Sequence, residues 1–342
     1  MMHKYLRLIL SLAVALLFLW LALKDVSFYE VRLTLNTLTY YWLLPYLVIS
    51  LASHYLRAER WRLLIEQGGV KTSRLTLFSG VMLGYLVNYA VPRLGELSRS
   101  VFVGNREQIS RTKLIGTVVL ERALDLAVML VLIVFVFVYL FRDYTLFAQI
   151  FGEETILWIK AAGSVEGIQY AIILLLSAVV LLLAGYLLFR LLSSWIPAVA
   201  NAKRIFTETS IKFLKGLISI KDVKNWPLFL LLTAGIWFCY VLMTYIPFTA
   251  FNMHTEFNLG LQEAMVITVI SALGVAIPSP GGIGTYHWFV SRSLLLLFAV
   301  PEATGVAYAI VTHLVMMIII LVFTPVLLAI HKTRNNRQGI SS

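Results

Sequence analysis

The chain has 342 residues, of which 60% are hydrophobic and 13% charged, and its mean hydropathy is +0.87. Soluble domains carry about 25% charged residues, so this composition excludes a soluble globular protein. The net charge of +11 does not indicate nucleic-acid binding. The basic residues cluster at the ends of apolar runs, where the positive-inside bias and anionic lipid headgroups account for them.

The first apolar run follows His3, Lys4 and Arg7, as in a secretory signal. It is longer than a signal core, and no small-residue cleavage site precedes Lys24, so we expect an uncleaved first span. Together with later apolar runs it gives about six full transmembrane helices. The predicted spans are Tyr5–Leu23, Tyr40–Tyr55, Leu114–Phe141, Ile168–Phe189, Trp226–Phe251 and Thr304–Ile330.

The charged residues between His54 and Arg62 end the second predicted span, and most are expected at the membrane interface. Arg57 is a candidate exception to this interfacial placement, because it lies one helical turn beyond His54 on the same face of the helix.

Two further apolar segments, Leu75–Lys113 and Leu261–Pro301, are interrupted by proline and glycine. Proline removes a backbone donor, and glycine admits conformations that other residues avoid. Inside a membrane such a break survives only where protein or a watery cavity satisfies the freed backbone groups. Interrupted segments at corresponding places in two halves indicate a transport site at the interface of a repeat.

Loop charges predict the topology. Basic stretches at residues 57–74 and 190–224 and in the tail are expected in the cytoplasm, with both termini. The acidic stretches 142–167 and 254–263 are expected outside. Each interrupted segment then enters and leaves on one side, as a re-entrant helical hairpin; the second has nearly uncharged flanks and allows two full crossings instead.

The predicted fold is therefore an all-α polytopic membrane protein with a single domain, 1–342. Its halves, residues 1–145 with hairpin 75–113 and residues 160–342 with hairpin 261–301, are expected to form an inverted repeat.

The first hairpin places ionisable groups at membrane depth, where they are costly and indicate function. A helix restarting at Leu94–Gly95 would point free N–H groups at the break, next to Arg93, which suits a phosphate or carboxylate. Glu96 and Arg99 share a helix face, so an internal pair that holds the hairpin closed is the structural alternative.

Glu121 and Asp125 share one face of the next span, beside Arg122, and Arg93 or Arg99 is their expected partner. Contact with a cationic substrate group or a proton relay is the alternative. In the second hairpin the N–H groups after Gly284 offer a second anion cradle, and His287 follows them. His313 is expected to be a packed core histidine.

Enzyme and metal chemistry have little support in the sequence. It contains no His-Glu-x-x-His, no Gly-x-Ser-x-Gly and no clustered aspartate pair, so we expect no catalytic residue, no metal and no cofactor. Cys239 is the only cysteine, which excludes an internal disulfide. Convergence of His54 or His287 with the carboxylates as acid and base stays open.

At three motifs the chain resembles the membrane region of lysylphosphatidylglycerol synthases and their standalone flippase-like relatives. The motifs are Asn88 with Pro92-Arg93-Leu94-Gly95-Glu96 and Arg99, Glu121-Arg122 with Asp125, and Pro280-Gly281-Gly282-Ile283-Gly284. The resemblance implies re-entrant helices and movement of a lipid between leaflets. The family commonly has an acid where this chain has His287. The soluble aminoacyl-transfer domain of the full-length synthases has no counterpart, so lysine transfer by this chain is not expected.

The sequence thus predicts a lipid translocase of a bacterial-type inner membrane, acting on an anionic phospholipid or a lipid-linked substrate. Its predicted substrate-binding residues are Asn88, Arg93, Glu96, Arg99, Glu121, Arg122, Asp125 and His287, and its broken helices are shaped by Pro92, Gly95, Pro280, Gly281, Gly282 and Gly284. The rivals are a membrane-embedded enzyme acting on a lipid-linked sugar or phosphate, and a non-transporting partner of a lipid-modifying or glycosyl-transferring enzyme. The sequence gives no oligomeric state.

Overall fold

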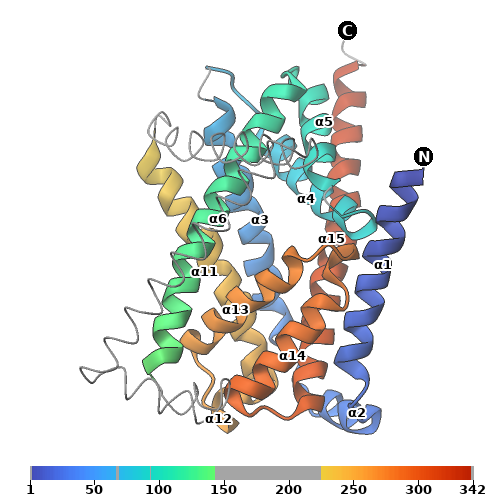
Figure 1. Cartoon of the computed structure of the whole chain (residues 1–342). Coiled ribbons are helices and arrows are strands. Elements are labelled where there is room, and N and C mark those ends of the chain that lie inside the picture. The colour runs from blue at the N-terminus through green and yellow to red at the C-terminus, as the bar shows by residue number, and fades with distance from the viewer. Residues whose placement is uncertain (1, 67–68, 93, 143–224, 340–342) are drawn as a thin grey trace, which may run out of the picture. The chain divides into compact units, whose positions relative to one another are not determined.

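The computed structural model describes residues 2–66, 69–92, 94–142 and 225–339 (Figure 1). The chain divides into two compact units, Met1–Val136 with Lys221–Ser342 and Phe137–Ile220, and the description below concerns the first. The predicted span Ile168–Phe189 lies outside the described residues. The predicted single domain and the predicted inverted repeat therefore stay predictions.

Every regular element in the described ranges is helical, which confirms the all-α prediction. The elements are α1 (Met2–Leu23), α2 (Phe28–Asn36), α3 (Leu43–Ile65), α4 (Arg74–Ala90), α5 (Gly95–Glu107), α6 (Arg111–Arg142), α11 (Trp226–Ala250), α12 (Met253–Glu256), α13 (Leu261–Ala276), the 3₁₀ turn η3 (Pro280–Gly282), α14 (Thr285–Phe298) and α15 (Glu302–Gly339).

Two of the described helices are long and apolar enough to cross a membrane by length and composition, namely α11 and the part Glu302–His331 of α15. A third span results if α1 and α2, which meet at an angle of 80°, are counted together. Helices α3 and α6 have 23 and 32 residues and are long enough. They carry several charged residues, so hydropathy alone does not select them.

Helix α3 is longer than the sequence predicted. It continues to Ile65 instead of ending at Tyr55. No proline or glycine interrupts residues 46–65, and the charged side chains near its end find partners. Arg62 pairs with Glu59 at 2.8 Å and with Glu66 at 3.0 Å on the helix surface.

Both interrupted segments are broken where the sequence predicted. Helix α4 ends at Ala90 and α5 begins at Gly95, and the two arms pack against each other. In the second segment α13 ends at Ala276 and α14 begins at Thr285, with η3 between them. The α4–α5 hairpin occupies the upper half of the unit in Figure 1, and the α13–α14 hairpin the lower half.

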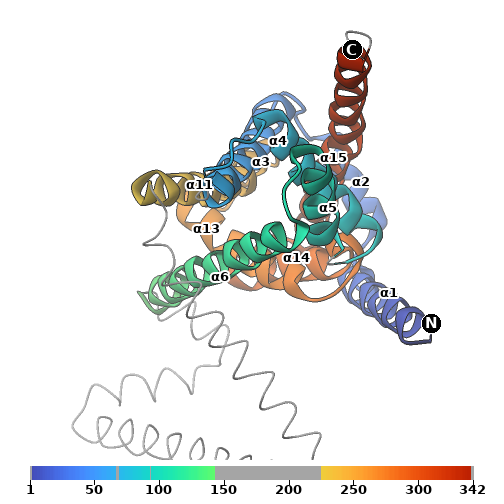
Figure 2. The ribbon, with the colours of Figure 1, turned by 90° about the horizontal axis from the view of Figure 1, so that it is seen from above.

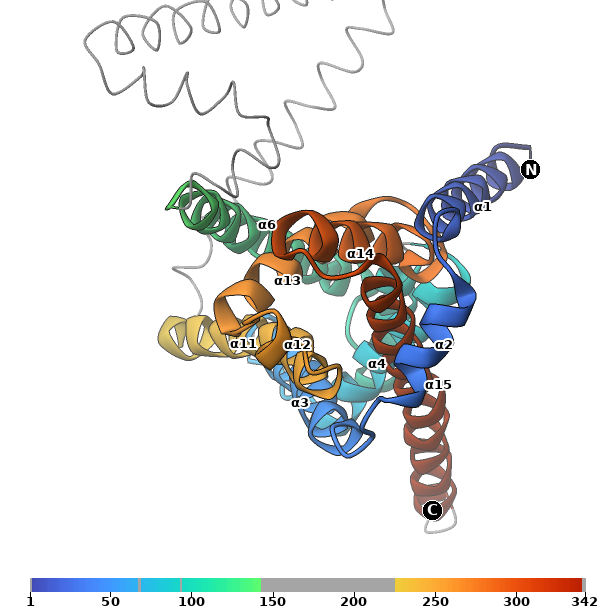
Figure 3. The same ribbon diagram turned by 90° about the horizontal axis from the view of Figure 1, so that it is seen from below.

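In the end-on views the arms of both hairpins lie in one ring with α3, α6 and α11, and α1 and α2 lie outside this ring (Figures 2 and 3). Helices α3 and α11 pack side by side; α3 also contacts α4, and α11 contacts α13. Helix α15 packs on α14 and on α4, so it touches both hairpins. Helix α1 packs on α14 and on η3.

Two apolar clusters fix this arrangement. One lies between α3, α4, α5 and α6 and includes Trp61, Leu77 and Val103; the other joins α11, α13, α14 and α15 around Phe248 and Tyr308. The outward faces of the long helices carry large exposed apolar side chains, among them Leu16, Trp20, Val119, Leu130, Val134, Leu231, Phe238, Val322 and Val326. Such a surface suits lipid contact.

Candidate functional site

The candidate site is a buried network of ion pairs between α3, α5 and α6. On α3 the residues His54, Arg57, Arg60 and Trp61 recur at helical spacing and point inward, each at most 4% exposed. His54 and Arg60 are therefore packed inside the protein and do not extend to the surface as interfacial side chains would. Arg57, marked in the sequence as the exception, is also buried.

Glu121 of α6 lies at the centre of the network and is fully buried. Its Oε1 accepts hydrogen bonds from Arg57 Nη1 at 2.8 Å and Arg60 Nη2 at 3.2 Å. Its Oε2 accepts one from Arg99 Nη2 at 3.0 Å. One carboxylate therefore connects α3 with the second arm of the broken hairpin.

Asp125, one turn further along α6, faces the same two arginines of α3. Its carboxylate lies 3.2 Å from Arg57 Nη1 and 2.7 Å from Arg60 Nη1. Arg57 also donates through Nη2 to the hydroxyl of Tyr240 on α11 at 2.8 Å. Removing Glu121 or Asp125 would leave buried arginines without a counter-charge, which costs roughly 3–5 kcal/mol.

Arg99 is held from a second side by an aromatic ring. Its guanidinium lies 4.7 Å from the centroid of the Trp61 ring, a cation–π contact. The indole of Trp61 is fixed in turn, because its Nε1–H donates to Thr117 Oγ1 at 2.9 Å. The expected pairing of Glu121 with Arg99 is therefore present, and Trp61 orients that guanidinium.

The network reaches the surface at an edge between α5 and α6. Glu96 pairs with Arg122 at 2.8 Å, and their side chains are 27% and 45% exposed. Among the ion pairs of the described residues, Glu96 bonds to Arg122 and Arg99 bonds to Glu121, so an internal Glu96–Arg99 pair is not what holds this hairpin. Arg122 also approaches Asp125 at 3.8 Å, which links the edge to the interior.

Asn88 closes the break of the first hairpin. Its Oδ1 accepts a hydrogen bond from the backbone N–H of Gly95, the first residue of α5, at 2.7 Å. A Cβ atom on Gly95 would overlap with the carbonyl oxygen of Gly84 and the Asn88 side chain. Asn88 thus satisfies a donor freed by the break. Arg93 lies outside the described residues, so its predicted contact with an anion stays a prediction.

The second break is built from glycines in left-handed conformations. The φ angles of Gly281, Gly282 and Gly284 are 58°, 80° and 81°. The backbone N–H of Gly284 donates to His287 Nδ1 at 3.2 Å, and Ser279 Oγ lies 2.9 Å from Thr285 Oγ1. Gly284 itself packs against the backbone of α1 at Ala15.

The two breaks meet inside the unit. Gly281 lies against the ring of Tyr89, one residue before α4 ends, and a Cβ on Gly281 would overlap with that ring. His313 of α15 joins the contact, with its ring centroid 6.4 Å from that of Tyr89 and 4.9 Å from that of His287. His313 is packed among aromatic rings, as expected for a core histidine.

His287 and His54 lack carboxylate partners among the hydrogen bonds of the described residues. His287 bonds to Gly284 and stacks on His313. His54 lies against Tyr85, with ring centroids 4.5 Å apart, and neither of its ring nitrogens has a hydrogen-bond partner in the part of the chain described.

Arg60 and Tyr240 are members of the network that the sequence did not predict as site residues. The spacing of Arg57, Arg60 and Trp61 on one helix face was a usable signal for Arg60. No local pattern marks Tyr240, because its partner is 183 positions away in sequence.

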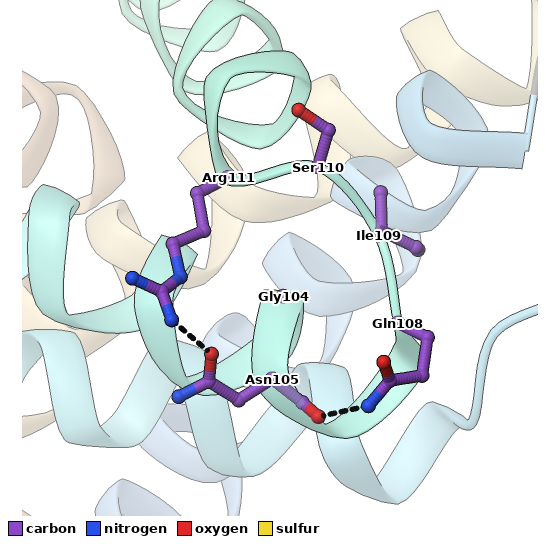
Figure 4. A pocket seen from close by; sticks show the side chains of 6 residues that line it. All are labelled: Gly104, Asn105, Gln108, Ile109, Ser110 and Arg111. Carbon is purple, nitrogen blue, oxygen red and sulfur yellow. Dashed lines mark hydrogen bonds between the residues drawn. The ribbon is translucent and has the colours of Figure 1, made fainter.

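A shallow hollow of about 500 Å³ lies apart from the network, at the turn between α5 and α6 (Figure 4). Arg111 donates to Asn105 Oδ1 at 2.7 Å and Gln108 to the Asn105 carbonyl at 2.9 Å across it. Within the described ranges, no three side chains of His, Cys, Asp and Glu gather as a metal site requires.

Comparison with known proteins gives one family. A family model described as the lysylphosphatidylglycerol synthase TM region matches residues 8–323. A UPF0104 membrane protein of Pyrococcus horikoshii is 25% identical over 331 residues, which cover 92% of this chain and 93% of that protein. A UPF0104 membrane protein of Methanocaldococcus jannaschii is 30% identical over 112 residues, only 32% of this chain and 33% of that relative. No solved structure matches the chain.

Proposed function

The chain belongs to the lysylphosphatidylglycerol synthase transmembrane-region family, and from this membership and the buried network we propose that it moves a lipid headgroup between membrane leaflets. The membrane protein would act as a flippase, or as the translocating part of one. The family's name refers to a phospholipid product, which supports a lipid as the substrate.

The observation that carries this proposal is the placement of Arg57, Arg99 and Glu121 inside an apolar helical unit, at most 4% exposed. Ionisable residues in membrane segments are costly and mark substrate paths or proton relays. Here the ion pairs join the second arm of the broken hairpin to α6, and the same carboxylate of α6, Glu121, is paired with α3. A headgroup that displaces one carboxylate from an arginine would therefore change how the hairpin is held.

The surface around the open edge suits a lipid. Leu97 and Val101 of α5, four residues apart, are 47% and 40% exposed beside Glu96. Acyl chains would lie on this apolar strip while the phosphate replaces Glu96 at Arg122. Arg99, one turn further along, would be the next guanidinium on the path. Because the tails stay in the bilayer, no wide aqueous pore is needed.

The enzyme alternative has less support. Acid–base chemistry requires a catalytic histidine within hydrogen-bond reach of its partner. His54 and His287 have no carboxylate among their hydrogen-bond partners in the described ranges. The carboxylates of the network bond instead to arginines, which suits holding an anion.

We propose that the protein lies in the inner membrane, with the α5–α6 turn and both termini on the cytoplasmic side. Arg106, Arg111 and Lys113 lie at this end of the first hairpin. The opposite end carries Glu256 and Glu263 before the second hairpin. This distribution agrees with the positive-inside bias.

The test is leaflet-resolved labelling of a fluorescent phospholipid in vesicles reconstituted with the purified protein. We expect Arg99→Gln to slow translocation at least about tenfold, because a charge-assisted hydrogen bond contributes roughly 1.5–3 kcal/mol. Glu121 keeps Arg57 and Arg60 as partners in this variant, which favours folding. The Arg93→Ala variant is tested in parallel, since the sequence predicts a loss there too.

The matched control is Arg111→Gln, which removes the same charge outside the network, where Arg111 contacts Asn105. It should translocate at the wild-type rate. Wild-type vesicles no faster than protein-free vesicles would refute the proposed function. Equal rates for wild type and Arg99→Gln, both above the rate of protein-free vesicles, would remove the network from the translocation path.

A further inference from the structure

The buried network contains more positive than negative charges. Arg57, Arg60, Arg99 and Arg122 contribute four positive charges, and Glu96, Glu121 and Asp125 contribute three negative ones. In the described part of the chain the network therefore has a net charge of +1. Its central members Glu121 and Arg60 are fully buried, so water does not screen this excess.

The other ion-pair networks of the described ranges are balanced. At the end of α3, Arg62 and Arg74 face Glu59 and Glu66. At the other end of the unit, Lys24 and Arg292 face Asp25 and Glu302. Both are partly exposed, where imbalance would cost little. Of the ion-pair networks in the described ranges, the buried one alone has an excess of charge, although an excess costs most in a buried place.

The same network has unused donors. The buried Nε–H groups of Arg57, Arg60 and Arg99 have no hydrogen-bond partner within the described residues. An unsatisfied buried donor costs about 1–3 kcal/mol, and more on a charged group. One further anion with several acceptor oxygens would balance the charge and supply partners for these donors.

We propose that this imbalance selects the headgroup: the network takes a lipid whose headgroup carries one negative charge, a phosphodiester esterified to an uncharged alcohol. This inference rests on the proposed function and names its substrate class. A phosphomonoester or diphosphate would bring a second negative charge and leave the site negative. The ammonium group of a zwitterionic headgroup would restore the positive excess.

The experiment compares three fluorescent lipids in the same reconstituted vesicles at about pH 8, where a phosphomonoester carries close to two charges. They are phosphatidylglycerol with one negative charge, phosphatidic acid with two, and the zwitterionic phosphatidylcholine. The readout is the ratio of translocation rates, which cancels differences in the amount of active protein. Wild type should move phosphatidylglycerol fastest.

Two variants shift the network charge in opposite directions at its accessible edge. Glu96→Gln raises it to +2 and should increase the ratio of phosphatidic acid to phosphatidylglycerol at least about tenfold. Arg122→Gln lowers it to zero and should increase the ratio of phosphatidylcholine to phosphatidylglycerol.

Matched controls change the same charges elsewhere. Arg111→Gln, at the α5–α6 turn, and Glu30→Gln, exposed on α2, should leave all three ratios unchanged. Ratios that are the same in Glu96→Gln, Arg122→Gln and wild type would overturn the inference. So would a wild type that prefers phosphatidic acid.

Binding of the same lipids, measured by native mass spectrometry, separates this inference from the proposed function. If no lipid is translocated but binding still follows network charge, translocation fails and the headgroup assignment stands. If lipids are translocated without charge preference, the proposed translocation stands and the headgroup assignment fails. Glycerophosphoglycerol serves as a soluble competitor: displacement of the lipid by this headgroup alone would show that the site recognises a soluble diester equally well.

Discussion

Gly95 marks the closest approach between the two arms of the first broken hairpin. Its backbone N–H is held by Asn88, and its Cα faces the carbonyl oxygen of Gly84 on α4. A side chain there would overlap with backbone, which cannot move aside as a flexible side chain can. Gly84, Gly95 and the side-chain amide of Asn88 thus determine how closely the start of α5 packs against α4. This packing places Arg99 of α5 near Glu121.

We predict that Gly95→Ala lowers the stability of the protein by roughly 1–3 kcal/mol through overpacking. Gly116→Ala is the matched control, because Gly116 lies within α6 and a Cβ there meets nothing within 4 Å. In a helix interior alanine is more favourable than glycine by up to about 1 kcal/mol, so this control should be neutral or stabilising. Thermal unfolding in detergent measures both. Equal melting temperatures for the two variants would contradict the close approach.

The arginines show where residue-level prediction from sequence ends. The sequence correctly marked Glu121, Asp125 and Arg99 as groups that need partners, because charge in an apolar run is costly. It placed Arg60 at the interface, because a charged residue near the end of an apolar run is most often found there. Arg60 can be buried because it pairs with Glu121, which lies 61 positions away in the sequence. No local sequence pattern indicates this pairing.

At the scale of elements, the contact between the two breaks is formed by η3 and the end of α4. Gly281 has a φ of 58°, which L side chains rarely adopt, and it faces the ring of Tyr89. The left-handed turn allows the backbone of the second hairpin to reach the first. Movement of one hairpin would therefore be transmitted to the other at this point.

We predict that Gly281→Ala is destabilising for two separable reasons. The left-handed conformation costs an alanine about 1–2 kcal/mol, and the new Cβ overlaps with the Tyr89 ring. In a Tyr89→Ala background the overlap disappears while the backbone cost remains, so the substitution should cost less. A double-mutant cycle on melting temperature tests this. Additive effects of the two substitutions would place Tyr89 and Gly281 apart.

Sequence reasoning predicted these breaks because proline and glycine act locally. The ends of α4 and α13 followed from Pro92 and Pro278, whose missing donors and steric clashes do not depend on the rest of the fold. The bend of 80° between α1 and α2 was not predicted. Ser27, whose hydroxyl caps α2, was its only local signal.

At the scale of the whole molecule, the lengths of the hairpin arms bear on topology. Helices α4 and α5 have 17 and 13 residues, and α13 and α14 have 16 and 14. At about 1.5 Å per residue each is shorter than the roughly 30 Å of bilayer hydrocarbon. A single arm therefore does not reach across, which favours hairpins that return to the side they came from.

The last prediction is that the two hairpins open on opposite sides of the membrane. Cys239 is first replaced by alanine, because it is the only cysteine and is half-buried. Exposed positions then flank each hairpin: Lys71→Cys and Lys113→Cys for the first, Thr255→Cys and Pro301→Cys for the second.

A membrane-impermeant maleimide should label the second pair in intact cells and the first pair only after permeabilisation. The basic residues around the first hairpin favour the cytoplasm. If Lys71→Cys and Lys113→Cys react from different sides, α4 and α5 together cross the membrane and Arg99 lies on a full span. If both pairs react from one side, the hairpins do not oppose each other and a headgroup has no path from one break to the other.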